Sequence, residues 1–258
     1  MKGKNALMEF VLTTTILISI SFMRFLSCSY AGEIKITFGL ALPPYVISES
    51  NSGLEYDIIK ESLAVKGHIM KPEYVPLARI PIVLKKRTSD GAATTNPSLD
   101  LKGIFFSEAH VVYQNVAISL KKHNLVVNRT ADLSNKNVIA FQNATMYLGQ
   151  EFAEVIKKAS SYQEIADQEK QVLSLFSDRN IVVISDINIF KFYKIKVAKN
   201  NPKIDTNIET TIAEIFPQTH YQVAFINEKI RDDFNFGLDV IKKNGRYQEI
   251  VKKYIEAH

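Results

Sequence analysis

Apolar and polar residues alternate in the first segment after residue 32. Every second residue of the segment 34–40 is apolar, which is typical of a strand with one buried face. Two prolines at 43–44 end this strand, because proline cannot donate a backbone hydrogen bond to a sheet. Tyr45 follows them and is predicted to lie exposed at the carboxyl end of the strand. In open α/β sheets this edge is where ligands bind.

Strand-like and helix-like patterns then alternate along the chain. The predicted elements are a helix over 56–66, an extended segment over 71–76, a helix over 80–86, a strand over 90–93, a strand over 138–141, a helix after residue 145, a helix over 162–176, a strand over 181–184 and two C-terminal helices on either side of residue 245. This order favours a largely parallel sheet covered by helices.

The first residues have the pattern of a secretory signal peptide. Two lysines precede an apolar run over 10–22, and small residues follow it, so residues 1–31 are predicted to be cleaved after Ala31. The run is too short to span the roughly 30 Å of a bilayer core as a permanent helix. The mature protein is therefore expected in the periplasm. An uncleaved anchor and a lipoprotein modified at Cys28 remain the alternatives, although the residues before Cys28 fit a lipoprotein signal only loosely.

Composition and charge argue against several classes of function. Hydrophobic residues make up 46% of the chain, enough for a sizeable core, and the only cysteine lies in the signal segment. Removal of the signal would lower the net charge from +5 to +3, and the basic residues form scattered pairs, so no nucleic-acid partner is predicted. The five histidines lack metal-binding spacing, and no Gly-x-Ser-x-Gly motif occurs. We therefore predict no metal, no cofactor and no catalytic residue.

Several short motifs follow one another along residues 32–258. They are Pro43-Pro44-Tyr45, Gly53-Leu54-Glu55-Tyr56-Asp57, Leu84-Lys85-Lys86-Arg87-Thr88-Ser89-Asp90-Gly91, Phe106-Ser107-Glu108, Phe141-Gln142-Asn143-Ala144-Thr145, Ser185-Asp186 and Lys243-Asn244-Gly245-Arg246-Tyr247. In order and spacing the set resembles the bacterial extracellular solute-binding proteins of family 3, the periplasmic proteins best known for binding polar amino acids.

The resemblance implies an α/β, two-lobe periplasmic-binding-protein type II fold, with two mixed sheets flanked by helices and a two-strand hinge. Lobe 1 is expected to comprise residues 32–119 plus 217–258, and lobe 2 residues 120–216. The hinges are expected near 117–120 and 216–223.

The resemblance also implies a function. A monomer would capture a small polar solute, an amino acid or a related amine or carboxylate, between its lobes by hinge closure and deliver it to an ABC permease. An alternative is a sensor that presents its bound state to a membrane receptor. A less favoured alternative is a dehydratase-like enzyme on the same fold, with Asp186 or Glu108 as a general acid.

Two site residues implied by the resemblance follow predicted strands. Tyr45 aligns with the aromatic residue that lies against the ligand, where its π face could attract an ammonium group, although it could equally pack on the neighbouring prolines. Asp186 ends an apolar strand, a costly place for an unpaired carboxylate. It aligns with the acid that receives a ligand's amino group, and its structural alternative is an acid that caps the following turn.

The helix start after the strand 138–141 is a candidate for binding the ligand's carboxylate. The hydroxyl of Thr145 and free backbone N–H groups would accept an anion there, with contacts from Asn143 and Ala144, although Thr145 could be an N-cap only. In lobe 1, three residues match the segment that gives backbone and hydroxyl contacts to the ligand: Thr94, Thr95 and Asn96.

The chain departs from the resemblance where amino-acid binders carry an arginine that grips the α-carboxylate. It has no arginine there, so Lys102 or Arg79 is expected to substitute, and Arg79 could instead form a surface ion pair. Leu77 stands where a second aromatic residue is usual. We therefore expect a ligand with an amino or cationic end at Asp186 and a second end that is recognised less strictly.

Overall fold

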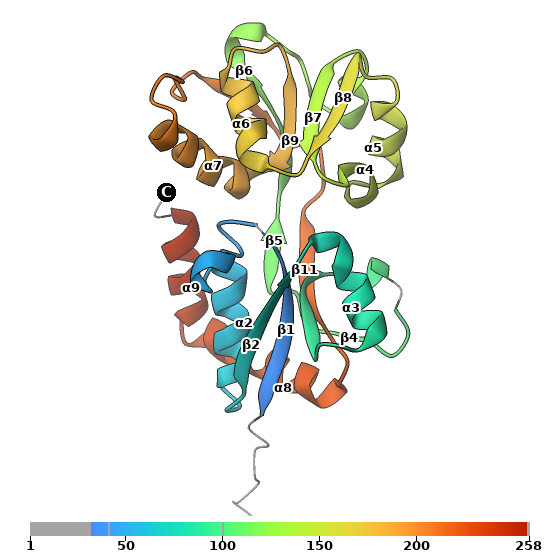
Figure 1. The fold of residues 1–258 in the computed structure, drawn as a ribbon, viewed down its shortest axis with the longest axis vertical. Helices are drawn as coiled ribbons and strands as arrows, with labels where there is room; N and C mark the ends of the chain where they lie inside the picture. Colours follow the sequence, from blue (N-terminus) through green and yellow to red (C-terminus); the bar gives the residue numbers. More distant parts are fainter. Residues whose placement is uncertain (1–31, 41, 100, 257–258) are drawn as a thin grey trace, which may run out of the picture.

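The computed structural model describes residues 32–40, 42–99 and 101–256. The predicted signal peptide, with Cys28, lies outside the described residues. Two lobes, each a sheet flanked by helices, lie one above the other and are joined by two extended segments (Figure 1). The predicted two-lobe α/β architecture is thereby confirmed. Within the described residues, no helix combines the length and the apolar character that a membrane crossing requires.

The sheet of lobe 1 is mixed, with the order β2-β1-β3-β11-β4 and with β5 paired to β11. Strand β1 runs parallel to β2 and β3, whereas β11 is antiparallel to β3, β4 and β5. The strands are β1 (Glu33–Gly39), β2 (Ile69–Val75), β3 (Gly91–Thr95), β4 (Phe105–Phe106), β5 (Val111–Tyr113) and β11 (Thr219–Phe225). The helices are α2 (Leu54–Ala64), α3 (Ile80–Lys86), α8 (Glu228–Lys243) and α9 (Arg246–Val251), which continues into the π-helical turn η6 (Lys252–Glu256). Three short 3-10 turns are η1 (Ser48–Ser50), η2 (Leu77–Arg79) and η3 (Pro97–Leu99).

The sheet of lobe 2 has the order β10-β6-β9-β7-β8, in which β7 is parallel to β8 and β9 and β6 is antiparallel to β9 and β10. Its strands are β6 (Asn115–Leu120), β7 (Asn137–Phe141), β8 (Ser161–Ile165), β9 (Val182–Asp186) and β10 (Thr210–Ala213). Its helices are α4 (Ala144–Tyr147), α5 (Gly149–Ile156), α6 (Gln168–Phe176) and α7 (Ile187–Asn200), with turns η4 (Lys121–His123) and η5 (Thr130–Leu133).

The predicted helix over 162–176 is wrong in its first part. Residues Ser161–Ile165 form strand β8, which pairs in parallel with β7, and only Gln168–Phe176 are helical. Asp167 separates the two elements because its side chain accepts hydrogen bonds from the first backbone N–H groups of α6. The sheet thereby gains an edge strand that the apolar periodicity did not show.

The chain crosses between the lobes at Gln114 and again between β10 and β11. The side-chain Nε2 of Gln114 donates to the carbonyl oxygens of Asn115 and Phe216, each at 2.9 Å, and so ties the two crossing segments together. Strand β6 pairs with β9 and β10, so residues 115–119 lie with lobe 2. The crossing therefore precedes the predicted boundary after residue 119 by almost the length of one strand.

Candidate functional site between the lobes

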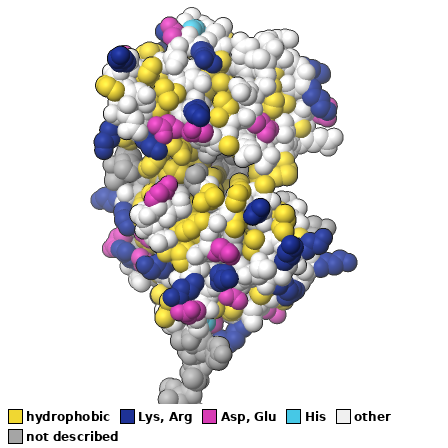
Figure 2. Space-filling view, in the orientation of Figure 1, with side chains coloured by type: hydrophobic (Ala, Val, Ile, Leu, Met, Phe, Trp, Pro, Cys, Tyr) yellow, Lys and Arg dark blue, Asp and Glu magenta, His cyan; other side chains and the backbone are white. Residues whose placement is uncertain are grey.

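A cleft separates the lobes, and apolar side chains gather on both of its sides (Figure 2). Its central cavity contains about 420 Å³ of space outside protein atoms, part of which is open to solvent. Both lobes line it, through Leu42, Leu77, Thr94, Tyr113, Asn115, Phe141, Tyr147, Gln168, Asp186, Ile189 and Tyr221. Two wider openings flank the cavity, one beside α3 and one beside β7, and Leu77 borders all three spaces.

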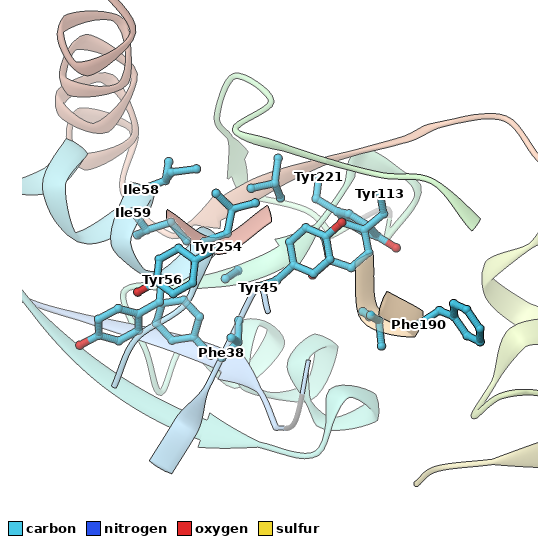
Figure 3. Close-up of a cluster of buried hydrophobic side chains, with 14 of the residues drawn as sticks. Phe38, Tyr45, Tyr56, Ile58, Ile59, Tyr113, Phe190, Tyr221 and Tyr254 are labelled. Atoms are coloured by element: carbon cyan, nitrogen blue, oxygen red, sulfur yellow. The ribbon is translucent and has the colours of Figure 1, made fainter. Parts of the chain in front are cut away.

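Tyr45 does not lie exposed as predicted; it is fully buried. Its backbone N–H donates to the Leu42 carbonyl in a tight turn, and its ring stacks on Tyr113 with centroids 3.8 Å apart (Figure 3). Its hydroxyl donates to Asp186 at 3.1 Å and accepts from the side chain of Asn188 at 3.0 Å. Tyr45 thus joins lobe 1 to the start of α7 in lobe 2, and it is not among the residues that line the central cavity.

Asp186 meets Tyr45 across the lobes, but protein donors surround its carboxylate. Besides the tyrosine hydroxyl, the backbone N–H groups of Gln114, Asn188 and Ile189 donate to it at 2.9, 2.9 and 3.0 Å. Burial raises its pKa to about 6, although these backbone donors act in the opposite direction. Asp186 is therefore the N-cap of α7 and a link between the lobes, and its lone pairs are engaged by the protein itself.

The predicted anion site in lobe 2 is occupied by a carboxylate of the protein. Glu164 accepts hydrogen bonds from the backbone N–H groups of Asn143 at 2.6 Å and Thr145 at 3.1 Å, from the Thr145 hydroxyl at 3.0 Å and from the Tyr162 hydroxyl at 2.7 Å. Partial burial opposes ionisation of Glu164, but the Tyr162 hydroxyl and the N–H groups lower its pKa below the usual range. Ala144 is fully buried.

The corresponding segment of lobe 1 is satisfied in the same way. Fully buried Glu55 accepts hydrogen bonds from the backbone N–H of Thr94 at 2.8 Å, its hydroxyl at 2.7 Å and Nε2 of His110 at 2.9 Å. The Thr95 hydroxyl donates to the carbonyl of Gln222 at 2.7 Å. Asn96 accepts from the backbone N–H of Ser98 at 3.0 Å and borders the opening beside α3, as Thr94 and Thr95 do.

The two basic residues that were expected to replace the missing arginine lie outside the cleft. Arg79 and Lys102 are both exposed, and neither borders the central cavity or its two openings. Arg79 falls at the junction of η2 and α3, where the helical turn brings Leu77 to the cleft and leaves residue 79 in solvent. Their expected role as carboxylate partners is therefore not supported by their positions.

Several cleft residues were missed from the sequence: Tyr113, Asn115, Phe141, Tyr147, Gln168 and Tyr221. Tyr113 and Tyr221 lie on the paired strands β5 and β11, next to the two crossings, and their rings meet at 4.7 Å between centroids. Phe141 and Tyr147 come from the end of β7 and from α4. The Val-Val-Tyr-Gln-Asn stretch at 111–115 was the available signal, because a crossing strand must border the cleft.

Two α/β lobes, a pair of crossing strands and a cavity shared by both lobes define the type II periplasmic-binding-protein class of fold. Structural comparison supports this. The chain is similar to a mutant of ArgBP from T. maritima (17% identity, 87% of this chain and 96% of that chain, TM-score 0.67). It is also similar to an ABC uptake transporter substrate-binding protein from Streptococcus pneumoniae with bound histidine (16% identity, 87% and 92%, TM-score 0.67).

A further similar structure is the ancestral amino acid-binding protein AncCDT-1, a precursor of cyclohexadienyl dehydratase (18% identity, 87% of this chain and 95% of that chain, TM-score 0.65). No family model matches the sequence, and comparison with curated proteins gives no match. At these identities the structural matches establish the fold.

Proposed function

We propose that the protein is a periplasmic solute-binding protein, which captures a small solute between its lobes and delivers it, as a monomer, to an ABC permease. The central cavity carries this proposal, because residues of both lobes line it. A solute in the cavity contacts both lobes only when they are close together, so binding favours the closed arrangement by its differential affinity. The similar structures include an ABC uptake transporter substrate-binding protein and an ancestral amino acid-binding protein, which supports the same function.

The enzyme alternative has weaker support. Asp186 borders the cavity and has a raised pKa, which is common for catalytic acids. Its oxygens, however, accept hydrogen bonds from four protein groups, so a substrate would have to displace one of them. Glu108, the other candidate acid, is exposed and borders neither the cavity nor its openings.

The test is closure of the cleft on ligand binding. A metabolite library is screened by thermal shift, where true ligands raise the melting temperature with concentration. Spin labels on cysteines introduced at Lys86 in α3 and Glu154 in α5 then report the distance between lobes. A hit should shorten this distance, because α3 and α5 belong to different lobes.

Two matched variants test whether the ligand-induced shortening depends on the cavity. Leu77→Trp places a bulky ring where all three cleft spaces meet and should abolish the ligand-induced shortening. Ile82→Trp, on the exposed face of α3, should leave it unchanged. If no library compound shortens the distance, or if Leu77→Trp responds like the unmodified protein, binding in this cleft is refuted.

A further inference from the structure

The charged groups at the cleft are carboxylates. Among the described residues that line the central cavity and its openings, Asp186 is the only one with a charged side chain. Glu55 lies directly behind Thr94, and Glu164 directly behind Asn143. A ligand carboxylate would lie near these acids with no basic side chain to pair with it. Removing its hydration shell in the cleft would therefore be costly in free energy. The cleft therefore disfavours amino acids and other anionic or zwitterionic solutes.

The same carboxylates cannot readily accept hydrogen bonds from a ligand. Four protein groups donate to Asp186, and Glu164 and Glu55 are engaged by the backbone and hydroxyl groups of Thr145 and Thr94. A primary ammonium group would lose its water and leave its three N–H donors without these acceptors. A cation whose nitrogen carries methyl groups needs no such acceptors and still feels the negative charge.

Aromatic rings from both lobes line the cavity. Tyr113 and Tyr221 come from lobe 1, and Phe141 and Tyr147 from lobe 2, where their centroids lie 6.5 Å apart. Ring faces attract cations, and this attraction is strongest where water is excluded. It requires no hydrogen bond, so it suits a methylated ammonium group.

The cavity wall also contains a neutral hydroxyl group without a hydrogen-bond partner among the described residues. The Tyr113 hydroxyl belongs to a side chain that is only 5% exposed, and it has no hydrogen-bond partner in the described part of the chain. Buried hydroxyls ordinarily have one. Asn115, two residues further along the chain, is 7% exposed and lines the same cavity. A hydroxyl or carbonyl on the ligand would satisfy such groups.

We propose that the cleft binds a compact organic cation that carries a methylated nitrogen and a neutral polar group but no carboxylate, an inference that rests on the solute-binding function proposed above. Aromatic faces and nearby acids stabilise the cation, and the Tyr113 hydroxyl with the Asn115 amide receives the polar group. The amino acids bound by similar structures differ from this ligand in their carboxylate.

Calorimetry with three matched probes tests the charge requirement. Choline carries the cation and a hydroxyl, 3,3-dimethyl-1-butanol is its uncharged isostere, and glycine betaine adds a carboxylate to the cation. Choline should bind at least about tenfold more tightly than either of the others. Equal affinity of the butanol would show that the charge is irrelevant, and equal affinity of betaine would show that a carboxylate is accepted; either result overturns the inference.

Variants of one cavity ring test the mode of binding. Tyr147→Leu removes the aromatic face from the short helix α4 and should weaken choline about tenfold, with little effect on the butanol. Tyr147→Phe keeps the ring and should bind choline within about twofold of the unmodified protein. Equal losses for both variants, or none for Tyr147→Leu, would contradict a cation held by ring faces.

Failure of this ligand class can be distinguished from failure of the proposed solute-binding function. If choline does not bind while another library compound shortens the distance between the lobes, the ligand class is wrong and solute binding stands. If no compound shortens that distance, the proposed function fails as well.

Discussion

At the scale of single residues, Glu55 holds the end of strand β3 in place. Thr94 has a φ of +55°, a left-handed backbone conformation that is costly for a β-branched residue. In this conformation its backbone N–H and its hydroxyl both donate to the Glu55 carboxyl group, at 2.8 and 2.7 Å. These hydrogen bonds to a fully buried carboxylate offset the backbone strain at the edge of the cleft.

Glu55→Gln should destabilise the fold. The side chain keeps its size, but it loses its charge, and an amide nitrogen replaces one of the two oxygens that accept hydrogen bonds from Thr94 and His110. We expect the free energy of unfolding to fall by about 2 kcal/mol, measured by urea denaturation. Glu49→Gln, at an exposed position in η1, is the control and should change it by less than about 0.5 kcal/mol. Similar values for the two variants would show that the buried contact is unimportant.

The sequence predicted part of the candidate site. Tyr45 and Asp186 do meet, because Tyr45 follows β1 and Asp186 ends β9, and the ends of both strands face the gap between the lobes. Thr145 borders neither the central cavity nor its openings, and its hydrogen bonds go to Glu164. That pairing depends on the register of β7 on β8, which places Glu164 opposite Ala140, three residues before Asn143. Such a register cannot be read from one sequence, so the internal carboxylates at both predicted ligand contacts were missed.

At the scale of elements, periodicity predicted α2, α3 and the buried strands β7 and β9, but it missed the 14-residue helix α7 and the fully buried strand β6. The helix expected over 80–86 is α3, and the helix expected over 56–66 is α2, two residues earlier. Strand β8 was missed because its five residues are partly exposed and carry no continuous apolar face. Short edge strands depend on their neighbours in the sheet more than on their own pattern.

The contact between α2 and α8 depends on a glycine. A Cβ atom at Gly237 would lie 1.9 Å from the carbonyl oxygen of Ser62. The backbone of α8 therefore packs directly on the backbone of α2 at this position, which leaves no room for a side chain. The close approach lets the buried Phe234 and Leu238 of α8 reach the core of lobe 1.

Gly237→Ala should therefore destabilise the protein, although alanine favours an isolated helix by about 1 kcal/mol. The helices must separate to admit the methyl group, and we expect the free energy of unfolding to fall by about 2 kcal/mol. Urea denaturation measures it. Asp239→Ala, an exposed change in the same helix that removes an ion pair with Lys243, should cost less than about 0.5 kcal/mol. A more stable Gly237→Ala variant would disprove the close approach.

At the scale of the whole molecule, one buried cluster couples the lobes at the base of the cleft. Tyr45 of lobe 1, Gln114 at the crossing and Asn188 of lobe 2 all contact the carboxylate of Asp186 or the hydroxyl bonded to it. Tyr45 stacks on Tyr113, so the cluster also continues into the cavity wall. The protonation state of Asp186 therefore bears on the stability of the joined lobes.

The expected pH dependence has a definite sign. Burial raises the pKa of Asp186 from 3.8 to about 6, so the folded protein binds this proton more tightly than the unfolded chain does. Its contribution to stability is full below about pH 4 and is lost as the pH rises through about 6, and the shift corresponds to about 3 kcal/mol. Asp186→Asn has no proton to lose and escapes this decline.

The free energy of unfolding of Asp186→Asn, minus that of the unmodified protein, should therefore increase by up to about 3 kcal/mol between pH 4 and pH 7. All other titrating groups are shared, so their contributions cancel in this difference. Tyr45→Phe gives the complementary test. The tyrosine hydroxyl is one of the groups that lower the pKa of Asp186, so its removal should raise that pKa further and steepen the decline. A flat difference for Asp186→Asn would mean that the carboxylate is hydrated and does not join the lobes.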